Sequence, residues 1–195
     1  RETAARVLVG SLCKQFLEEF QITVLSYVVG IGRVSIKEDS YPYKRLLKKL
    51  KKSNLLCPDQ VAEKKMIKEI DRAKRHKDTV GGKFRVIAYG VPLGLGSYRQ
   101  WDCRLDGKIA RSFMSIPAVK AVEIGSGVSA SQEFGTSVHD AIYYQKGKNP
   151  KAFDFYRKTN RAGGLEGGMS IGEPIVVNGY MKPISTTLTR LDSVD

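Results

Sequence analysis

The hydrophobic residues at the start of the sequence change their spacing abruptly near residue 21. In residues 1–20 they recur every three or four positions, which is typical of an α-helix with one apolar face. Residues 22–30, Ile-Thr-Val-Leu-Ser-Tyr-Val-Val-Gly, are instead rich in β-branched side chains and end at a glycine. We therefore predict a helix over 1–20 that packs into a core, followed at once by a buried strand. The apolar face of the helix consists of Ala5, Leu8, Val9, Leu12, Cys13, Phe16, Leu17 and Phe20.

The rest of the sequence alternates irregularly between helical and β-rich segments. Helices are expected at 59–76 and 105–115, and strands at 83–89, 119–124 and 174–181. The first of these helices has Asp59 as its expected N-cap and Val61, Met66, Ile67, Ile70 and Ala73 as its apolar face. Segments 37–58, 90–96 and 126–158 are expected to be a polar irregular stretch, a Gly/Pro turn and a long loop or flap. Because no linker divides the chain, we expect a single α+β domain over 1–195.

The sequence carries a large excess of positive charge, with 33 lysines and arginines against 20 acids and a formal net charge of +13. Such a charge indicates an anionic partner: a nucleic acid, an anionic membrane, or small phosphorylated and carboxylated ligands. No apolar run approaches the roughly 20 residues that a membrane-spanning helix needs, so we expect no membrane partner. The three cysteines and two histidines form no zinc-binding or redox pattern, so we expect no metal site and favour the reducing cytoplasm.

Most of the charge excess lies in residues 44–77, which hold 13 lysines and arginines against four acids. One interpretation is a basic module that binds nucleic acid. The stretch has no interleaved aromatic residues beyond the neighbouring Tyr41 and Tyr43, so it offers no platform for base stacking. We therefore favour a solvated surface and keep nucleic acid as the alternative partner.

Two short segments contain residue types that suit an anion or a cofactor. Residues 163–172 contain five glycines, which either expose backbone N–H groups to an anion or allow tight turns and close backbone packing. Residues 182–187, Lys-Pro-Ile-Ser-Thr-Thr, offer an ammonium and three hydroxyls for a phosphate or the polar edge of a flavin, or else form an ordinary strand end. His139 and Asp140 could form an acid–base pair, although a histidine in a polar loop is more often solvated.

Nine short strings, taken together and in order, are more informative than any single motif. They are Arg-Glu-Thr-Ala-Ala-Arg-Val at 1–7, Cys-Pro-Asp at 57–59, Asp-Thr-Val-Gly-Gly at 78–82, Gly-Val-Pro-Leu-Gly-Leu-Gly at 90–96, Met-Ser-Ile-Pro-Ala-Val-Lys at 114–120, Val-Glu-Ile-Gly at 122–125, Asn-Arg-Ala-Gly-Gly-Leu-Glu-Gly-Gly at 160–168, Gly-Glu-Pro-Ile at 172–175 and the Lys-Pro-Ile-Ser-Thr-Thr string. In this order and at these separations they closely resemble the chorismate synthase family. The resemblance runs from residue 1 to 195 and is weakest at 37–56 and 126–158.

The resemblance implies a lyase of aromatic amino acid biosynthesis. Members of the family convert 5-enolpyruvylshikimate 3-phosphate to chorismate and phosphate by a 1,4-anti elimination, the last step of the shikimate pathway, and require reduced FMN. Some members reduce the flavin themselves with NADPH. The family fold packs a layer of helices between two antiparallel sheets, and the enzyme assembles as a cytoplasmic homotetramer. The resemblance thus implies this fold, the FMN cofactor and a small-molecule substrate for the present chain.

The family's flavin contacts fall on three parts of this sequence. They are the pair Pro117 and Ala118, the glycine Gly167, and the run Lys182, Pro183, Ile184, Ser185 and Thr186. The chain departs from the family at two of these positions, with Pro117 where many members have asparagine and Ile184 where many have threonine or serine. Both replacements remove a polar side chain that could contact the cofactor.

The two ends of the sequence resemble the interiors of family motifs. Arg1 ends a motif whose residues contact flavin, and the resemblance implies that it contacts substrate. The family's histidines, its substrate-binding arginines and a C-terminal Arg/Asp motif have no counterpart within 1–195, so we expect no catalytic residue in this chain. We therefore expect the core fragment of a chorismate synthase, truncated at both ends and inactive alone.

Overall fold

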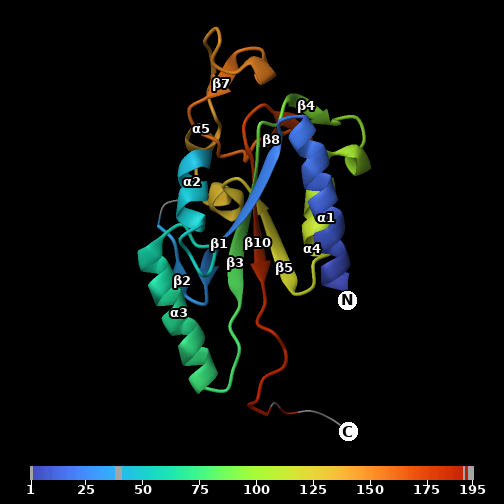
Figure 1. The fold of residues 1–195 in the computed structure, drawn as a ribbon. Helices are drawn as coiled ribbons and strands as arrows, with labels where there is room; N and C mark the ends of the chain where they lie inside the picture. The colour runs from blue at the N-terminus through green and yellow to red at the C-terminus, as the bar shows by residue number, and fades with distance from the viewer. Residues whose placement is uncertain (1, 38–40, 191, 193–195) are drawn as a thin grey trace. The chain divides into compact units, whose positions relative to one another are not determined.

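The computed structural model describes residues 2–37, 41–190 and 192, and its fold is α+β. Its largest sheet has the order β2-β1-β3-β10-β5. The strands are β1 (Thr23–Ile31), β2 (Val34–Ser35), β3 (Gly82–Tyr89), β5 (Val119–Ile124) and β10 (Ile175–Met181). β1 and β2 form an antiparallel hairpin, and Figure 1 shows β3 and β10 in the middle of the sheet. The strands predicted at 22–30, 83–89, 119–124 and 174–181 are confirmed.

Two smaller sheets are built from strands that the sequence pattern did not predict. One has the order β4-β9-β8, with β4 at Leu93–Gly96, β8 at Leu165–Glu166 and β9 at Met169–Ile171. The other pairs β6 (Ile142–Tyr144) with β7 (Phe155–Arg157) in antiparallel register. β4 corrects the expectation that 90–96 is only a turn. Its pairing with β9 shifts register between Leu93 and Gly96, as glycines within a strand often allow.

The segment 126–158 contains several short elements. They are the 3₁₀ helices η2 (Gly127–Gln132) and η3 (Pro150–Ala152), the helix α5 (Gly135–Val138), and the pair β6 and β7. A third 3₁₀ helix, η1, spans Trp101–Cys103. The role of 126–158 as a flap stays a prediction.

The four longer helices are α1 (Glu2–Glu19), α2 (Tyr43–Leu50), α3 (Gln60–Arg75) and α4 (Leu105–Met114). Three of them confirm the helices predicted at 1–20, 59–76 and 105–115. None of the helices within the described ranges is long and apolar enough to cross a membrane.

Helix α2 corrects the expectation that 37–58 is irregular. Its Leu46 and Leu50 are buried four positions apart, which is the spacing of one helix face. The segment Tyr-Lys-Arg-Leu-Leu-Lys-Lys-Leu contains more basic residues than leucines. The composition of this segment therefore indicates a polar, irregular stretch, although its leucines recur with the spacing of a helix.

Helix α3 begins at the residue that the sequence indicated. The side chain of Asp59 accepts hydrogen bonds from the backbone N–H groups of Val61 and Ala62, at 2.9 and 3.1 Å, and so caps the helix. The predicted apolar face is only partly right, because Val61 is 66% exposed whereas Glu63 is buried. Glu63 tolerates burial because the Ser53 hydroxyl and the Leu55 N–H donate to its Oε1, at 2.7 and 2.9 Å.

The prediction that the first helix packs into a core is wrong for the described residues. No residue of α1 is buried, and the side chains of Leu8, Leu12 and Phe16 are each at least 60% exposed. An apolar stripe shows that a helix has a face suited to burial, but it does not identify the surface that covers that face.

By their contacts, the residues divide into two compact units. The first comprises Arg1–Leu25, Val86–Arg111 and Glu123–Val177, and the second comprises Ser26–Arg85, Ser112–Val122 and Asn178–Asp195. The core of the first unit includes Ile87, Leu165 and Val177, and the core of the second includes Tyr27, Leu46, Met66 and Val119. The single domain over 1–195 stays a prediction.

Candidate functional site

The first predicted cofactor-binding pair lies in a tight turn of the second unit, between α4 and β5. The N–H of Val119 donates to the carbonyl oxygen of Ile116 at 3.1 Å, so Pro117 and Ala118 occupy the two central turn positions. Ala118 has φ +69°, and this combination of proline followed by a left-handed residue is typical of a type II turn. Such a turn usually has glycine or asparagine at the position of Ala118, so the backbone here is strained.

The second predicted run, Lys182–Thr186, follows β10 and lies beside the residues that follow α3. The Thr79 hydroxyl donates to the carbonyl oxygen of Ile184 at 2.6 Å. Farther along, the Leu188 N–H donates to the carbonyl oxygen of Lys77 at 3.0 Å. The run has no regular secondary structure, and the Thr79 contact at Ile184 and the Lys77 contact just beyond the run hold this part of the chain beside 77–79.

These two segments meet in space although more than sixty residues separate them in the sequence. The backbone N–H of Lys182 donates to the carbonyl oxygen of Ala118 at 2.9 Å. The turn and the run therefore form one continuous surface in the second unit, which we call the turn–run site (Pro117, Ala118 and 182–186).

The turn–run site presents polar groups that no neighbouring side chain uses. The side chains of Lys182, Ser185 and Thr186 are exposed, and within 2–37, 41–190 and 192 they form no hydrogen bond or ion pair. One ammonium and two hydroxyls are thus available to an anionic ligand. Ile184, at a position where many family members have a hydroxyl, is 64% exposed and adds an apolar surface.

Gly167, the third predicted contact, lies in the first unit at the tip of a hairpin. Glu166 pairs with Met169, so Gly167 and Gly168 form a two-residue turn, with φ +59° and +86°. Two positive φ values are the requirement of a type I′ turn, which explains the two glycines. A Cβ built at Gly167 would have no atom within 4 Å, so this glycine also leaves open space beside the hairpin.

Two further glycines of 163–172 serve close backbone packing. A Cβ on Gly163 would collide with the backbone of Gly125, and one on Gly164 would collide with the carbonyl of Pro174. The structural interpretation of this stretch, as a tight turn with closely packed backbones, is therefore confirmed. A ligand contact at Gly167 is compatible with that interpretation and stays a prediction.

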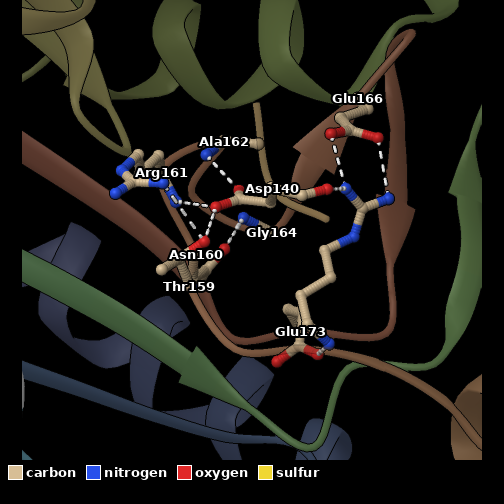
Figure 2. Close-up of polar contacts among 9 residues, drawn as sticks. Asp140, Thr159, Asn160, Arg161, Ala162, Gly164, Glu166 and Glu173 are labelled. Carbon is tan, nitrogen blue, oxygen red and sulfur yellow. Dashed lines mark hydrogen bonds and ion pairs between the residues drawn. The ribbon is translucent and has the colours of Figure 1, made fainter. Parts of the chain in front are cut away.

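A buried carboxylate, Asp140, organises the loop that leads into these glycines (Figure 2). Its Oδ1 accepts from the Thr159 hydroxyl at 2.5 Å and from the Arg161 N–H at 3.0 Å, and its Oδ2 accepts from the Ala162 N–H at 2.9 Å. Burial alone would raise the pKa of Asp140, but these hydrogen bonds and the nearby Arg157 charge outweigh it and lower the pKa. The carboxylate thus stays ionised and fixes the backbone of 159–162.

Asp140 does not form the acid–base pair with its neighbour in the sequence. His139 is exposed, and within the described ranges the groups that donate to the Asp140 carboxylate all belong to residues 159–162. His139 is therefore solvated, which is the alternative that the sequence favoured. The sequence indicates Asp140 only as a partner for His139. Nothing in the spacing of the residues predicts its hydrogen bonds to 159–162.

A second polar contact, between Arg157 and Glu166, supports the hairpin that carries Gly167. The Arg157 guanidinium donates to both carboxylate oxygens of Glu166, at 2.8 and 2.9 Å. The same guanidinium donates to the carbonyl oxygen of Asp140 at 3.2 Å, and the Arg157 N–H donates to Glu173 at 2.9 Å. The two bonds to Glu166 join β7 to β8, the hairpin strand just before the turn, and Figure 2 draws them as dashed lines at the labelled Glu166. No motif in the sequence indicated this arginine.

Arg1, the predicted substrate contact, lies outside the described residues. The structure thus brings together the predicted residues of the turn–run site, whereas Gly167 belongs to the other unit. Among the described residues, no group of three histidine, cysteine, aspartate or glutamate side chains is arranged to hold a metal ion.

Comparison with known proteins gives one consistent result. A family model described as chorismate synthase matches residues 1–195. Relatives named chorismate synthase are 48% identical over 195 residues in Desulforudis audaxviator and 50% identical over 197 residues in Caldicellulosiruptor bescii. Both alignments cover 100% of this chain, and they cover 49% and 50% of the respective relative. The chain therefore spans about half the length of the curated relatives it matches.

A solved structure supports the same likeness in three dimensions. A crystal structure of chorismate synthase is similar with a TM-score of 0.86 and 44% sequence identity, covering 94% of this chain and 56% of that chain. None of the relatives named here is described as a nucleic-acid-binding protein. The nucleic-acid alternative is therefore not supported.

Proposed function

The chain belongs to the chorismate synthase family, and on that premise we propose that its turn–run site forms part of the FMN-binding site of a chorismate synthase. The reaction proposed for the whole enzyme is the conversion of 5-enolpyruvylshikimate 3-phosphate to chorismate and phosphate. Reduced FMN would supply the electron density that helps the phosphate group to leave. The observation that carries the proposal is the 2.9 Å hydrogen bond from Lys182 to Ala118, which joins two separate family motifs into one surface.

The residues present fit a phosphorylated flavin. Lys182 would neutralise negative charge on the cofactor, and Ser185 and Thr186 would donate to phosphate or ring oxygens. Pro117 has no N–H and no polar side chain, so its contact would be apolar or through its carbonyl. Ile184 would likewise pack against an apolar part of the flavin.

Gly167 of the first unit is a separate proposed contact with FMN, which rests on its family motif. The open space at Gly167 would let backbone approach the flavin closely. Asp140 and Arg157 would act as positioning residues, because they hold the loop at 159–162 and the strand before Gly167 without contacting the cofactor themselves.

Further properties of the whole enzyme follow from the family. We propose that it is a carbon–oxygen lyase that works in the cytoplasm as a homotetramer, and that Arg1 contacts substrate. NADPH is proposed as the source of reducing equivalents for the flavin. We also propose that the 195-residue chain alone forms no chorismate, because it spans only half the length of its relatives. Chorismate released by this polypeptide with reduced FMN and substrate would contradict that last proposal.

Titration with FMN tests the cofactor site directly. FMN should give a saturable change in flavin absorbance or fluorescence, and Lys182→Ala should raise the Kd roughly 10- to 100-fold, since a hydrogen bond to a charged group contributes about 1.5–3 kcal/mol. Lys68→Ala removes the same charge from the exposed face of α3 and should change the Kd less than about twofold. The proposal fails if FMN gives no saturable change, or if the two variants weaken binding equally.

A further inference from the structure

A basic pocket lies in the second unit, where α2 meets the beginning of α3. Its volume is about 560 Å³, and five cationic side chains line it together with one carboxylate, among the residues that the structure describes. They are Lys44, Arg45, Lys48, Lys49, Lys52 and Asp59. None of them belongs to the turn–run site.

The helix period explains why so many cations face one space. Lys44 and Lys48 lie four positions apart in α2, as do Arg45 and Lys49, and residues with this spacing share a helix face. Lys52 follows in the turn after the helix and lines the same pocket. The buried Leu46 and Leu50 hold the opposite face of α2 against the core. The fold therefore fixes the backbone of the basic face and directs its side chains into the pocket.

Two of the five cations are also ordered by an aromatic ring. The Lys49 ammonium lies 4.7 Å from the centre of the Tyr41 ring, and the Arg45 guanidinium lies 5.9 Å from it. Tyr41 itself is only 3% exposed, so the ring is a fixed support. Cations held in this way lose less conformational freedom when they bind an anion.

The charge of the pocket is unbalanced. Like charges four positions apart on a helix repel one another, and they lower helix stability. Asp59 supplies only one negative charge against these five positive ones, and its Oδ1 accepts the N–H groups of Val61 and Ala62. Lys44, Lys48 and Lys52 form no ion pair with another residue of 2–37, 41–190 and 192. A concave surface that carries several unpaired charges of one sign strengthens the local electrostatic potential. It therefore attracts ligands of the opposite charge.

We propose that this pocket binds a ligand that carries two or more phosphate groups. Four of the cations, from position 44 to position 49, are spread over about 7.5 Å of helix, at about 1.5 Å per residue, and Lys52 adds a fifth beyond the end of α2, so one phosphate group cannot contact them all. The pocket has the size of typical small-molecule sites, roughly 300–1,000 Å³. No aromatic residue is among those that line it, so it has no stacking platform for a nucleic acid strand. Inorganic polyphosphates and nucleoside polyphosphates share the required chemistry.

Calorimetric titration with inorganic tripolyphosphate at low ionic strength tests the proposal. We expect saturable binding with a stoichiometry of one. The triple variant Lys44→Gln, Lys48→Gln, Lys52→Gln should raise the Kd roughly tenfold or more. The matched control is Lys64→Gln, Lys65→Gln, Lys68→Gln, which removes the same charge from exposed positions of α3 outside the pocket. The control should keep the Kd within about threefold, because those charges act only at long range. Equal losses in the two triple variants, or no saturable heat, would overturn the proposal.

Three further titrations define the ligand. Orthophosphate should bind much more weakly than tripolyphosphate, and equal affinity for the two would contradict the requirement for several phosphate groups. ATP that binds as tightly as tripolyphosphate would mean that the phosphate chain alone is recognised. Tighter binding of ATP would identify nucleoside polyphosphates as the preferred source. Tight binding of single-stranded DNA with no binding of either polyphosphate would overturn the proposal in favour of a nucleic acid surface.

Discussion

The backbone N–H of Lys182 donates to the carbonyl oxygen of Ala118 at 2.9 Å, although the two residues are 64 positions apart in the sequence. This hydrogen bond connects the end of β10 to the turn before β5, its neighbour in the sheet. The turn places Ala118 in a left-handed conformation, and the hydrogen bond holds its carbonyl there. The geometry of the turn–run site therefore depends on one strained alanine.

The left-handed conformation of Ala118 predicts that valine and glycine substitutions at this position affect the stability of the protein differently. Ala118→Val should lower the free energy of unfolding by about 1–2 kcal/mol, because a β-branched side chain is strongly disfavoured at φ +69°. Ala118→Gly should leave the protein at least as stable as the wild type, since glycine adopts this φ without strain. Urea unfolding of the two variants measures the difference. A valine variant as stable as the glycine variant would show that the turn is not left-handed at this residue.

The sequence indicated both segments of the turn–run site as candidates, but it carried no signal for the supports of the glycine hairpin. The Met-Ser-Ile-Pro-Ala-Val-Lys and Lys-Pro-Ile-Ser-Thr-Thr strings identified two segments, but only the sheet order places them beside each other. Asp140 and Arg157 carry no local signal, because their partners are backbone groups or side chains brought close by folding. Lys151 is a similar case, since its ammonium donates to the carbonyl oxygen of Gly90 at 2.8 Å.

The secondary structure shows the same division between local and distant causes. Helix α3 was predictable because Asp59 caps it within the same few residues. Strand β4 was not predictable, because its Leu-Gly-Leu-Gly sequence reads as a turn and becomes a strand only by pairing with β9. The exposed face of α1 is a third kind of case, in which the helix itself was predicted correctly but its burial was not.

Asp140→Asn should destabilise the protein by about 1–3 kcal/mol. The asparagine amide keeps only one acceptor oxygen, whereas Asp140 accepts from Thr159, Arg161 and Ala162 through both oxygens. One N–H of the buried loop would then face another donor. Thermal unfolding measures the loss, and His139→Gln, at the exposed neighbouring position, is the control expected to stay within about 0.5 kcal/mol of wild type. Equal stability of the two variants would contradict the buried role of Asp140.

The stability of the protein should depend on pH through Glu63. Burial opposes ionisation of this carboxyl, but hydrogen bonds from Ser53, Leu55 and Asn54 outweigh burial and lower its pKa. A carboxyl whose pKa is lower in the folded state binds fewer protons when folded. It therefore stabilises the protein fully above its unfolded pKa of about 4.3, and this contribution is lost as the pH falls through the folded pKa.

Unfolding measured between pH 2 and pH 6 tests this dependence. Glu63→Gln should be less stable than wild type at pH 6, and the difference should shrink as the pH falls below the unfolded pKa and through the lower folded pKa of Glu63. A difference that does not change with pH would mean that the loss comes from altered packing. Glu19→Gln, a substitution at an exposed position of α1, is the control expected to stay within about 0.5 kcal/mol of wild type at pH 6.

Replacing Arg157 by lysine should show whether the planar guanidinium is required. Lysine keeps the positive charge, but a single ammonium cannot donate two parallel hydrogen bonds to Glu166 and a third to the carbonyl of Asp140. The Arg157 side chain is only 10% exposed, so water would replace these bonds poorly. We expect Arg157→Lys to lower the free energy of unfolding by about 1–2 kcal/mol. Arg161→Lys is the matched control, because among the described residues the Arg161 guanidinium makes only a 3.5 Å contact with Thr159, and the residue is exposed. If the two variants lose the same stability, or if neither loses any, the Arg157–Glu166 contact does not support the hairpin that carries Gly167.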